Sequence, residues 1–243
     1  MYAIFTKEIN AFFSSLVGYI AVGVFLVAMS GFLWFFPETN LLDYGYSTLD
    51  QLFAIAPNIF LFLIPAITMR AFAEETQTGT IELLATRPLT DLNIILGKYF
   101  ACIILIITAL TPTLIYYITI YQLGDPVGNI DTGAVIGSYL GLLLLGSAFA
   151  AIGIFASSLT NNQIVSFVLA LFLCFVTHIG FEFIKDLPIF NETISGVVEM
   201  LGMNYHYNSL SRGLIDSRDV IYFLSLITFF IVLTRFQLEK RTW

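Results

Sequence analysis

Long apolar stretches recur along this 243-residue chain and are separated by short polar segments. Hydrophobic residues make up 58% of the sequence and charged residues 11%, whereas soluble domains have about 45–50% and about 25%. One soluble core cannot bury so much apolar surface, but stretches of about 20 apolar residues match the thickness of a bilayer. These features exclude a soluble enzyme, a disordered chain and a disulfide-stabilised scaffold. They indicate a polytopic membrane protein.

Six apolar stretches are long enough for spanning helices. A backbone in lipid must satisfy its own hydrogen bonds, so we expect helices rather than strands. The longest uncharged interval runs from Thr132 to Phe181, and a polar cluster at 157–163 divides it into two helices joined by a tight hairpin. We therefore expect an all-α polytopic membrane protein, one transmembrane domain over 1–243, with spans at about 16–36, 53–69, 99–122, 133–156, 164–184 and 219–236.

The distribution of lysine and arginine predicts the orientation of these spans. With the N-terminus inside, seven of these residues lie on the cytoplasmic side and three lie outside. The segments 37–52 and 123–132 carry carboxylates but no lysine or arginine. An arrangement with both termini in the cytoplasm is favoured.

Three further segments are not simple spans. Residues 1–13 alternate apolar and polar side chains at helical spacing, which predicts an amphipathic helix lying in the membrane interface. Residues 70–98 form a polar cytoplasmic insertion between the second and third spans. Residues 185–218 form the longest external loop, with a mildly amphipathic stretch at about 192–203.

Small residues recur at four-residue spacing at the start of the fourth span, at Gly133, Gly137 and Gly141. Such spacing lets two helix backbones approach closely. We expect these glycines to serve helix packing within the bundle, with a subunit interface as the alternative.

Residues suited to catalysis are sparse. No charge lies deep in any expected span, and the sequence lacks H-E-x-x-H, G-x-S-x-G and Walker A motifs. Cys102 and Cys174 lie in apolar stretches and are expected to be buried hydrophobes. His178 is expected to pack inside its span, and His206 has no evident partner. We expect no catalytic residue, metal site or cofactor, and the net charge of −7 argues against nucleic acid as a partner.

The insertion at 70–98 is the most informative segment. Gly79 is expected to break a first helix, and Thr80 to cap a short second one that carries Glu82 in its first turn. Arg87-Pro88 ends that helix, and Thr90-Asp91 caps the helix leading into the third span.

The short helix carries Ile81, Leu83 and Leu84 without a core of its own, which predicts a partner surface. An ordinary solvated loop is the alternative. Glu74 and Glu75 are expected either to face the partner or to pair with Arg70 or Arg87.

Segment 74–88 resembles the coupling region of ABC-2 type permeases, the membrane subunits of ABC transporters. Lys7-Glu8 followed by Phe12-Phe13 looks like the amphipathic entry helix of that family, and residues 211–222 look like its approach to the last span. Residues 60–70 and the sequence from Gly79 to Leu84 are most similar to the gliding-motility permease subunits of the family.

The resemblance implies two partners besides the lipid bilayer: a P-loop ATP-binding subunit, and a second permease-type subunit with a large periplasmic domain. It implies a non-enzymatic permease subunit in a bacterial inner membrane, linked to gliding motility. The alternative is a mechanical transmitter that moves no cargo and passes the ATPase cycle to a periplasmic partner. The residues expected to couple to the ATPase are Glu75, Gly79, Thr80, Glu82, Leu83, Leu84 and Arg87.

Overall fold

A computed structural model describes residues 1–42, 45–80, 90–187 and 191–240, and these form helices, turns and loops without a strand. The expected all-helical fold is confirmed for this part of the chain. In chain order the elements are α1 (Tyr2–Ser14), α2 (Leu16–Trp34), α3 (Asp50–Thr68), α4 (Arg70–Gln77), α6 (Asp91–Leu110), the 3₁₀ turn η1 (Thr111–Thr113), α7 (Leu114–Leu123), α8 (Thr132–Ser158), α9 (Gln163–Phe175), the π-helix η2 (Val176–Gly180), α10 (Phe181–Lys185), α11 (Glu192–Met200), α12 (Met203–Leu210) and α13 (Ser217–Glu239).

Five helices in the described residues are long and apolar enough to cross a membrane, and a sixth is added if the bent pair α1 and α2 forms one span. Several combine neighbouring elements: α3 continues into α4, α6 continues through η1 into α7, and α9 continues through η2 into α10. The helix that contains the second candidate span is therefore longer than the expected span, since it runs from Asp50 to Gln77 and includes the first part of the polar insertion.

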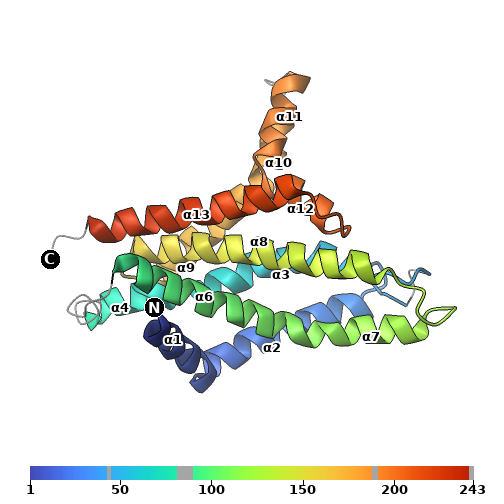
Figure 1. Ribbon diagram of the computed structural model, residues 1–243, viewed down its shortest axis with the longest axis horizontal. Coiled ribbons are helices and arrows are strands. Elements are labelled where there is room, and N and C mark those ends of the chain that lie inside the picture. Colours follow the sequence, from blue (N-terminus) through green and yellow to red (C-terminus); the bar gives the residue numbers. More distant parts are fainter. Residues whose placement is uncertain (43–44, 81–89, 188–190, 241–243) are drawn as a thin grey trace.

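The helix α8 lies at the centre of the bundle, in contact with α3, α4, α6, α9, α12 and α13 (Figure 1). Its buried side chains are mostly small or apolar, including Ala148, Ala150 and Ala151, so its neighbours approach closely on several sides. By contrast, α2 buries Phe25, Met29 and Leu33 on one face and exposes Ile20, Val24 and Val27 on the other. Such a one-sided pattern is that of a peripheral helix whose exposed face suits lipid.

The start of α1 and the end of α13 lie at the same end of the bundle as α4 and the hairpin between α8 and α9 (Figure 1). We call this end the α4 end, and the opposite end, which carries the turn between α7 and α8, the α7 end. The hairpin is shorter than the polar cluster suggested, because α8 continues through Ser158 and the side chain of Asn162 caps α9 by accepting from the backbone N–H of Ile164 at 2.9 Å.

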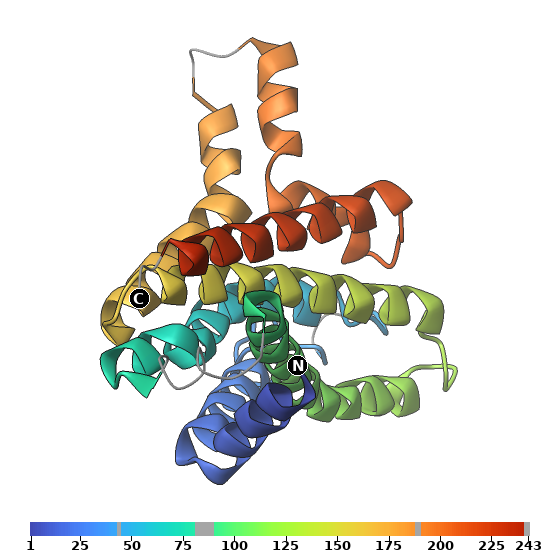
Figure 2. The ribbon, with the colours of Figure 1, turned by 60° about the vertical axis from the view of Figure 1, so that its left-hand side comes forward.

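The segment 185–218, expected to be a loop, contains helices. Helices α10 and α11 form a hairpin that projects from the bundle, and it is held by an ion pair between Lys185 and Glu199 at 2.6 Å (Figure 2). Helix α12 then returns to the bundle and buries Met203, Tyr207 and Leu210. The Tyr207 hydroxyl donates to the Phe53 carbonyl at 2.7 Å, and burial raises the pKa of this phenol above its ordinary value.

Two of the three spaced glycines make room for this return. A Cβ on Gly137 would come within 2.7 Å of the Gly213 carbonyl oxygen, and one on Gly141 within 2.5 Å of the Leu210 Cβ. Gly213 has a φ of +78°, which a residue without a Cβ adopts easily. A Cβ on Gly133 would meet only the Asp131 Oδ1 at 3.3 Å. Within this chain, Gly137 and Gly141 therefore pack against α12 and the turn that follows it.

Candidate functional site at the α4 end

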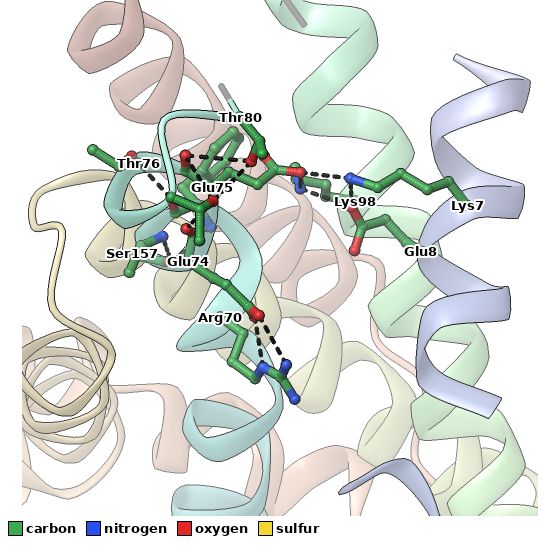
Figure 3. A network of polar contacts seen from close by, with 12 residues as sticks. Lys7, Glu8, Arg70, Glu74, Glu75, Thr76, Thr80, Lys98 and Ser157 are labelled. Carbon is green, nitrogen blue, oxygen red and sulfur yellow. Dashed lines mark hydrogen bonds and ion pairs between the residues drawn. The ribbon is translucent and has the colours of Figure 1, made fainter. Parts of the chain in front are cut away.

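Four charged side chains from three helices meet at the α4 end (Figure 3). Lys7 and Glu8 come from α1, Glu75 from α4 and Lys98 from α6. The Lys98 ammonium lies 2.8 Å from Glu8 Oε1 and 2.9 Å from Glu75 Oε1. The Lys7 ammonium lies 2.7 Å from the same Glu75 oxygen. We call these four residues the ion cluster; their formal charges sum to zero.

The ion cluster is largely shielded from solvent. The Lys98 side chain is 1% exposed and that of Glu75 is 10% exposed, whereas that of Lys7 is 54% exposed. The Lys98 ammonium also lies 5.2 Å from the centre of the buried Phe72 ring, at a distance suited to a cation–π contact. Ion pairs shielded from water are screened little by salt, so the pairing of α1, α4 and α6 through this cluster is less sensitive to salt than that of surface pairs.

A serine connects α8 to the junction of α3 and α4. Ser157 is fully buried, and its hydroxyl accepts from the backbone N–H groups of Phe72 at 2.9 Å and Ala73 at 3.0 Å. The same hydroxyl donates to the Met69 carbonyl at 3.0 Å. The Ser157 side chain thus satisfies the hydrogen-bonding capacity of three backbone groups where α3 and α4 meet. It thereby connects α4 to the central helix α8.

The two adjacent carboxylates of α4 have different partners. Glu74 pairs with Arg70 one turn away, at 2.7 Å, which is one of the pairings that the sequence left open. Glu75 instead points across to α1 and α6, and its Oε2 has no hydrogen-bond partner among the described residues. Glu75 therefore lies beneath the surface, where it connects helices.

The helix break predicted at Gly79 is present. Helix α4 ends at Gln77, and Gly79 has a φ of +71°, in the left-handed region where glycine is favoured. The Thr80 hydroxyl lies 3.0 Å from that of Thr78. At the other side of the insertion, Thr90 caps α6 as predicted by accepting from the Asn93 backbone N–H. The remaining coupling candidates, Glu82, Leu83, Leu84 and Arg87, lie outside the described residues.

A cavity of about 560 Å³ opens beside the ion cluster, between α1, α4 and α6. Its lining joins charged groups, among them Lys7, Arg70 and Glu74, to apolar ones such as Phe12 and Ile67. Thr80 lies at its edge, so the cavity adjoins the first residues of the expected coupling segment. Among the described residues there is no group of three or more His, Cys, Asp or Glu side chains that could hold a metal ion.

The sequence did not reveal the ion cluster. Its members are separated by up to 91 positions along the chain, and Lys98 reads as one more cytoplasmic lysine at the foot of a span. The one available signal was the pattern of Lys7-Glu8 on an otherwise apolar helix face, together with two carboxylates directly below the second span. Such charges need partners if their helices pack together.

The chain combines a bundle of membrane-spanning helices with a polar helical insertion that is tied into the bundle by buried ion pairs. These features define a multi-pass helical membrane protein. The family model described as ABC-2 family transporter protein matches residues 2–234, so the chain belongs to the ABC-2 family. It is the membrane component of such a transporter and not the ATPase, and members of this family typically work with an ATP-binding subunit. No curated protein matches the chain.

Proposed function

We propose that this chain is the permease subunit of a heteromeric ATP-driven transporter in a bacterial inner membrane. The α4 end faces the cytoplasm, where it meets the ATPase, and both termini lie on that side. Support comes from the family, from the excess of lysine and arginine in the segments at the α4 end, and from the placement of the start of α1 and the end of α13 there. In this orientation α1 lies in the cytoplasmic interface.

A P-loop ATP-binding subunit docks on the segment that follows α4. Gly79, with a φ of +71°, ends the regular helical path of α4, and Thr80 begins the segment. From the sequence, Glu82 and Arg87 supply polar contacts to the ATPase, and Leu83 and Leu84 supply apolar anchors. Glu75 is placed to act indirectly, because its carboxylate connects α4 to Lys7 and Lys98 rather than facing solvent.

The observation that carries the proposal is the connection of α4 to three other helices directly before the docking segment. The ion cluster joins α4 to α1 and α6, and Ser157 joins it to α8. Packed helices shift as rigid units, so a displacement of the segment moves these spans together. The ATPase cycle thereby reaches the membrane bundle without any nucleotide site in this chain.

Replacement of both docking leucines tests the proposal. In the membrane-extracted complex, Leu83→Asp with Leu84→Asp is expected to abolish co-purification of the ATPase, because two charges replace the apolar anchors. The matched control, Leu83→Met with Leu84→Met, keeps volume and apolarity and is expected to retain the ATPase. Unchanged co-purification with the double Asp variant, at equal amounts in the membrane, would contradict the docking site.

A second permease-type subunit with a large periplasmic domain completes the proposed complex, and the sequence similarity to gliding-motility permeases links it to gliding. The projecting α10–α11 hairpin exposes apolar side chains such as Phe183 and Val197, and it offers a contact surface for such a subunit. It also favours the second candidate function, in which the chain transmits the ATPase cycle to a periplasmic partner without moving cargo. Measurement of ATP hydrolysis in proteoliposomes separates the two: stimulation by a cargo supports transport, and stimulation by the periplasmic partner alone supports transmission.

A further inference from the structure

A second cavity, of about 710 Å³, lies between α3, the η2–α10 segment and α12. Polar side chains are few in this bundle, but several of them gather in the walls of this cavity. They are Asp50, Asn58, His178, Glu182, Asn204, Asn208 and Arg212. None of these residues belongs to the ion cluster or to the docking segment that follows α4.

The cavity reaches from the end of α3 into the membrane-spanning part of that helix. Asp50 begins α3, and Asn58 lies two turns further along the same face, which is about 12 Å at the rise of an α-helix. Both residues are exposed, as is Ala54 between them. A polar face at this depth is unfavourable against lipid and is expected where it lines a water-filled or ligand-filled space.

The opposite wall contains an irregular helix. Residues Val176–Gly180 form a π-helix, a distortion that is frequent at functional sites and that places His178 in the cavity wall. His178 is 3% exposed, and its Nδ1 has no hydrogen-bond partner among the described residues. Buried polar atoms are normally satisfied, so an orphaned ring nitrogen in a cavity wall points to a missing partner.

The hydrogen-bonding capacity of the cavity is mixed and largely unused. Among the described residues the side-chain amide of Asn208 has no partner, and that of Asn58 makes only a 3.4 Å contact with the Ala54 carbonyl. Asn204 donates to Glu182 Oε2 at 2.9 Å, which orients the carboxylate and leaves its other oxygen available. Neither Asp50 nor Arg212 has an ion-pair partner within the described chain.

We propose that this cavity binds a neutral, hydroxyl-rich ligand of the size of one or a few sugar units, and that this is the class of cargo the permease handles. Amide side chains both donate and accept, as hydroxyl groups do, and the three asparagines therefore match vicinal hydroxyls. The volume lies within the range of pockets that enclose small organic ligands.

Ligands of a single charge fit the cavity less well. A phosphate or carboxylate would meet Asp50 and Glu182 with only Arg212 to offset them. A compact ammonium group has only donors, so it would leave the donor groups of Arg212 and the asparagines unmatched. The experiment below distinguishes binding of an anion or of a cation from binding of the proposed neutral ligand.

The test is saturation-transfer NMR on the full chain in lipid nanodiscs, without the ATPase. The probes are glucose, N-acetylglucosamine and maltotriose as neutral sugars, choline as a cation and inorganic phosphate as an anion. At least one neutral sugar is expected to bind. Asn58→Ala with Asn208→Ala is expected to weaken that binding by about tenfold or more, since each lost hydrogen bond accounts for a factor of a few.

Matched variants control for folding and for charge. Asn161→Ala removes an exposed amide at the α4 end and is expected to leave sugar binding unchanged. Glu182→Gln keeps an acceptor for Asn204, so sugar binding is expected to persist, whereas a cation site would lose its affinity. If the double variant fails to fold, Asn208→Ala alone serves, because its side chain has no hydrogen bond to lose within the described part of the protein.

Binding of choline or phosphate without any sugar would overturn the proposal, as would the absence of sugar binding or equal binding by the double variant. The assignment of this cavity as a cargo site rests on the proposed permease function. The two fail separately, because sugar binding is measured without the ATPase, while co-purification with the Leu83 and Leu84 variants is measured without any sugar.

Discussion

Two cavities in the described part of the bundle hold their polar side chains in opposite ways. Beside the α4-end cavity, Lys7, Glu8, Glu75 and Lys98 pair with one another across three helices, with N···O distances of 2.7–2.9 Å for the three shortest pairs. In the cavity between α3 and α12, Asn58 and Asn208 keep most of their hydrogen-bonding capacity free. Paired charges hold helices in fixed relative positions, whereas free polar groups are available to a ligand. This difference accords with the two proposed roles, which are force transmission at the α4 end and ligand binding between α3 and α12.

The largest expected effect comes from breaking the ion cluster at its most buried member. Among the described residues, Lys98→Met leaves Glu8 and Glu75 with the half-exposed Lys7 as their ion-pair partner, and loss of one partner from a buried pair costs about 3 kcal/mol. We expect a clearly lower midpoint of thermal unfolding in detergent. Lys240→Met, an exposed lysine at the same end, is the matched control and is expected to unfold like the parent protein. Equal midpoints for the two variants would show that the cluster does not hold the helices together.

A smaller effect is expected where α12 returns to the bundle. In Gly141→Val the new Cβ would come within 2.5 Å of the Leu210 Cβ, and overpacking of this kind costs about 1–3 kcal/mol. Hydrogen exchange in 203–210 should accelerate as α12 is pushed away. A Cβ at Gly31 on α2 would meet no atom within 4 Å, so Gly31→Val is expected to leave exchange in α12 unchanged. Should both variants behave alike, the close approach at Gly141 would not determine the position of α12.

Removal of the Tyr207 hydroxyl is a further test of the difference between the α4 end and the region around α12. Tyr207→Phe keeps the ring in place but leaves the Phe53 carbonyl without its donor at 2.7 Å. A buried hydrogen bond of this kind contributes about 1 kcal/mol. A modest drop in the unfolding midpoint is expected, together with faster exchange in α12 and little change near Lys98. An effect confined to the α4 end would contradict the separation of the two regions.

The smallest effect is expected from the exposed ion pair on α4. Arg70 and Glu74 are 34% and 39% exposed, and pairs one turn apart on a solvated helix contribute at most about 0.5 kcal/mol. Arg70→Gln should therefore unfold within about 1 °C of the parent protein. A loss as large as that of Lys98→Met would mean that exposure does not distinguish the two kinds of charge pair at this end.

Much of the helical framework could be predicted, because its signals are local. The break at Gly79, the cap at Thr90 and the hairpin near Asn162 follow from the conformational preferences of single residues. Less of the candidate site could be predicted. Glu75 and Lys98 are 23 positions apart, and nothing in the spacing of either residue shows that their side chains meet within 2.9 Å.

The structure of the region after the fifth span was still harder to predict from the sequence. Residues 185–218 read as a loop, because α11 and α12 are short and carry polar residues. Their positions are set by contacts that local sequence does not show: the Lys185–Glu199 pair links α10 to α11, and Tyr207 and Leu210 pack α12 onto α3 and α8. His206, which has no evident partner in the sequence, meets Asp219 at 2.7 Å across the turn that follows.

Composition and the lengths of the apolar stretches were enough to establish a helical membrane bundle, since lipid demands that each segment satisfy its own backbone and bury no isolated charge. They could not establish which charges pair, which glycines touch another helix or which polar side chains remain unpaired. Those properties arise when helices far apart in the chain pack side by side, and packing depends on the shapes and positions of both partners at once. The ion cluster and the polar cavity therefore became visible only in three dimensions.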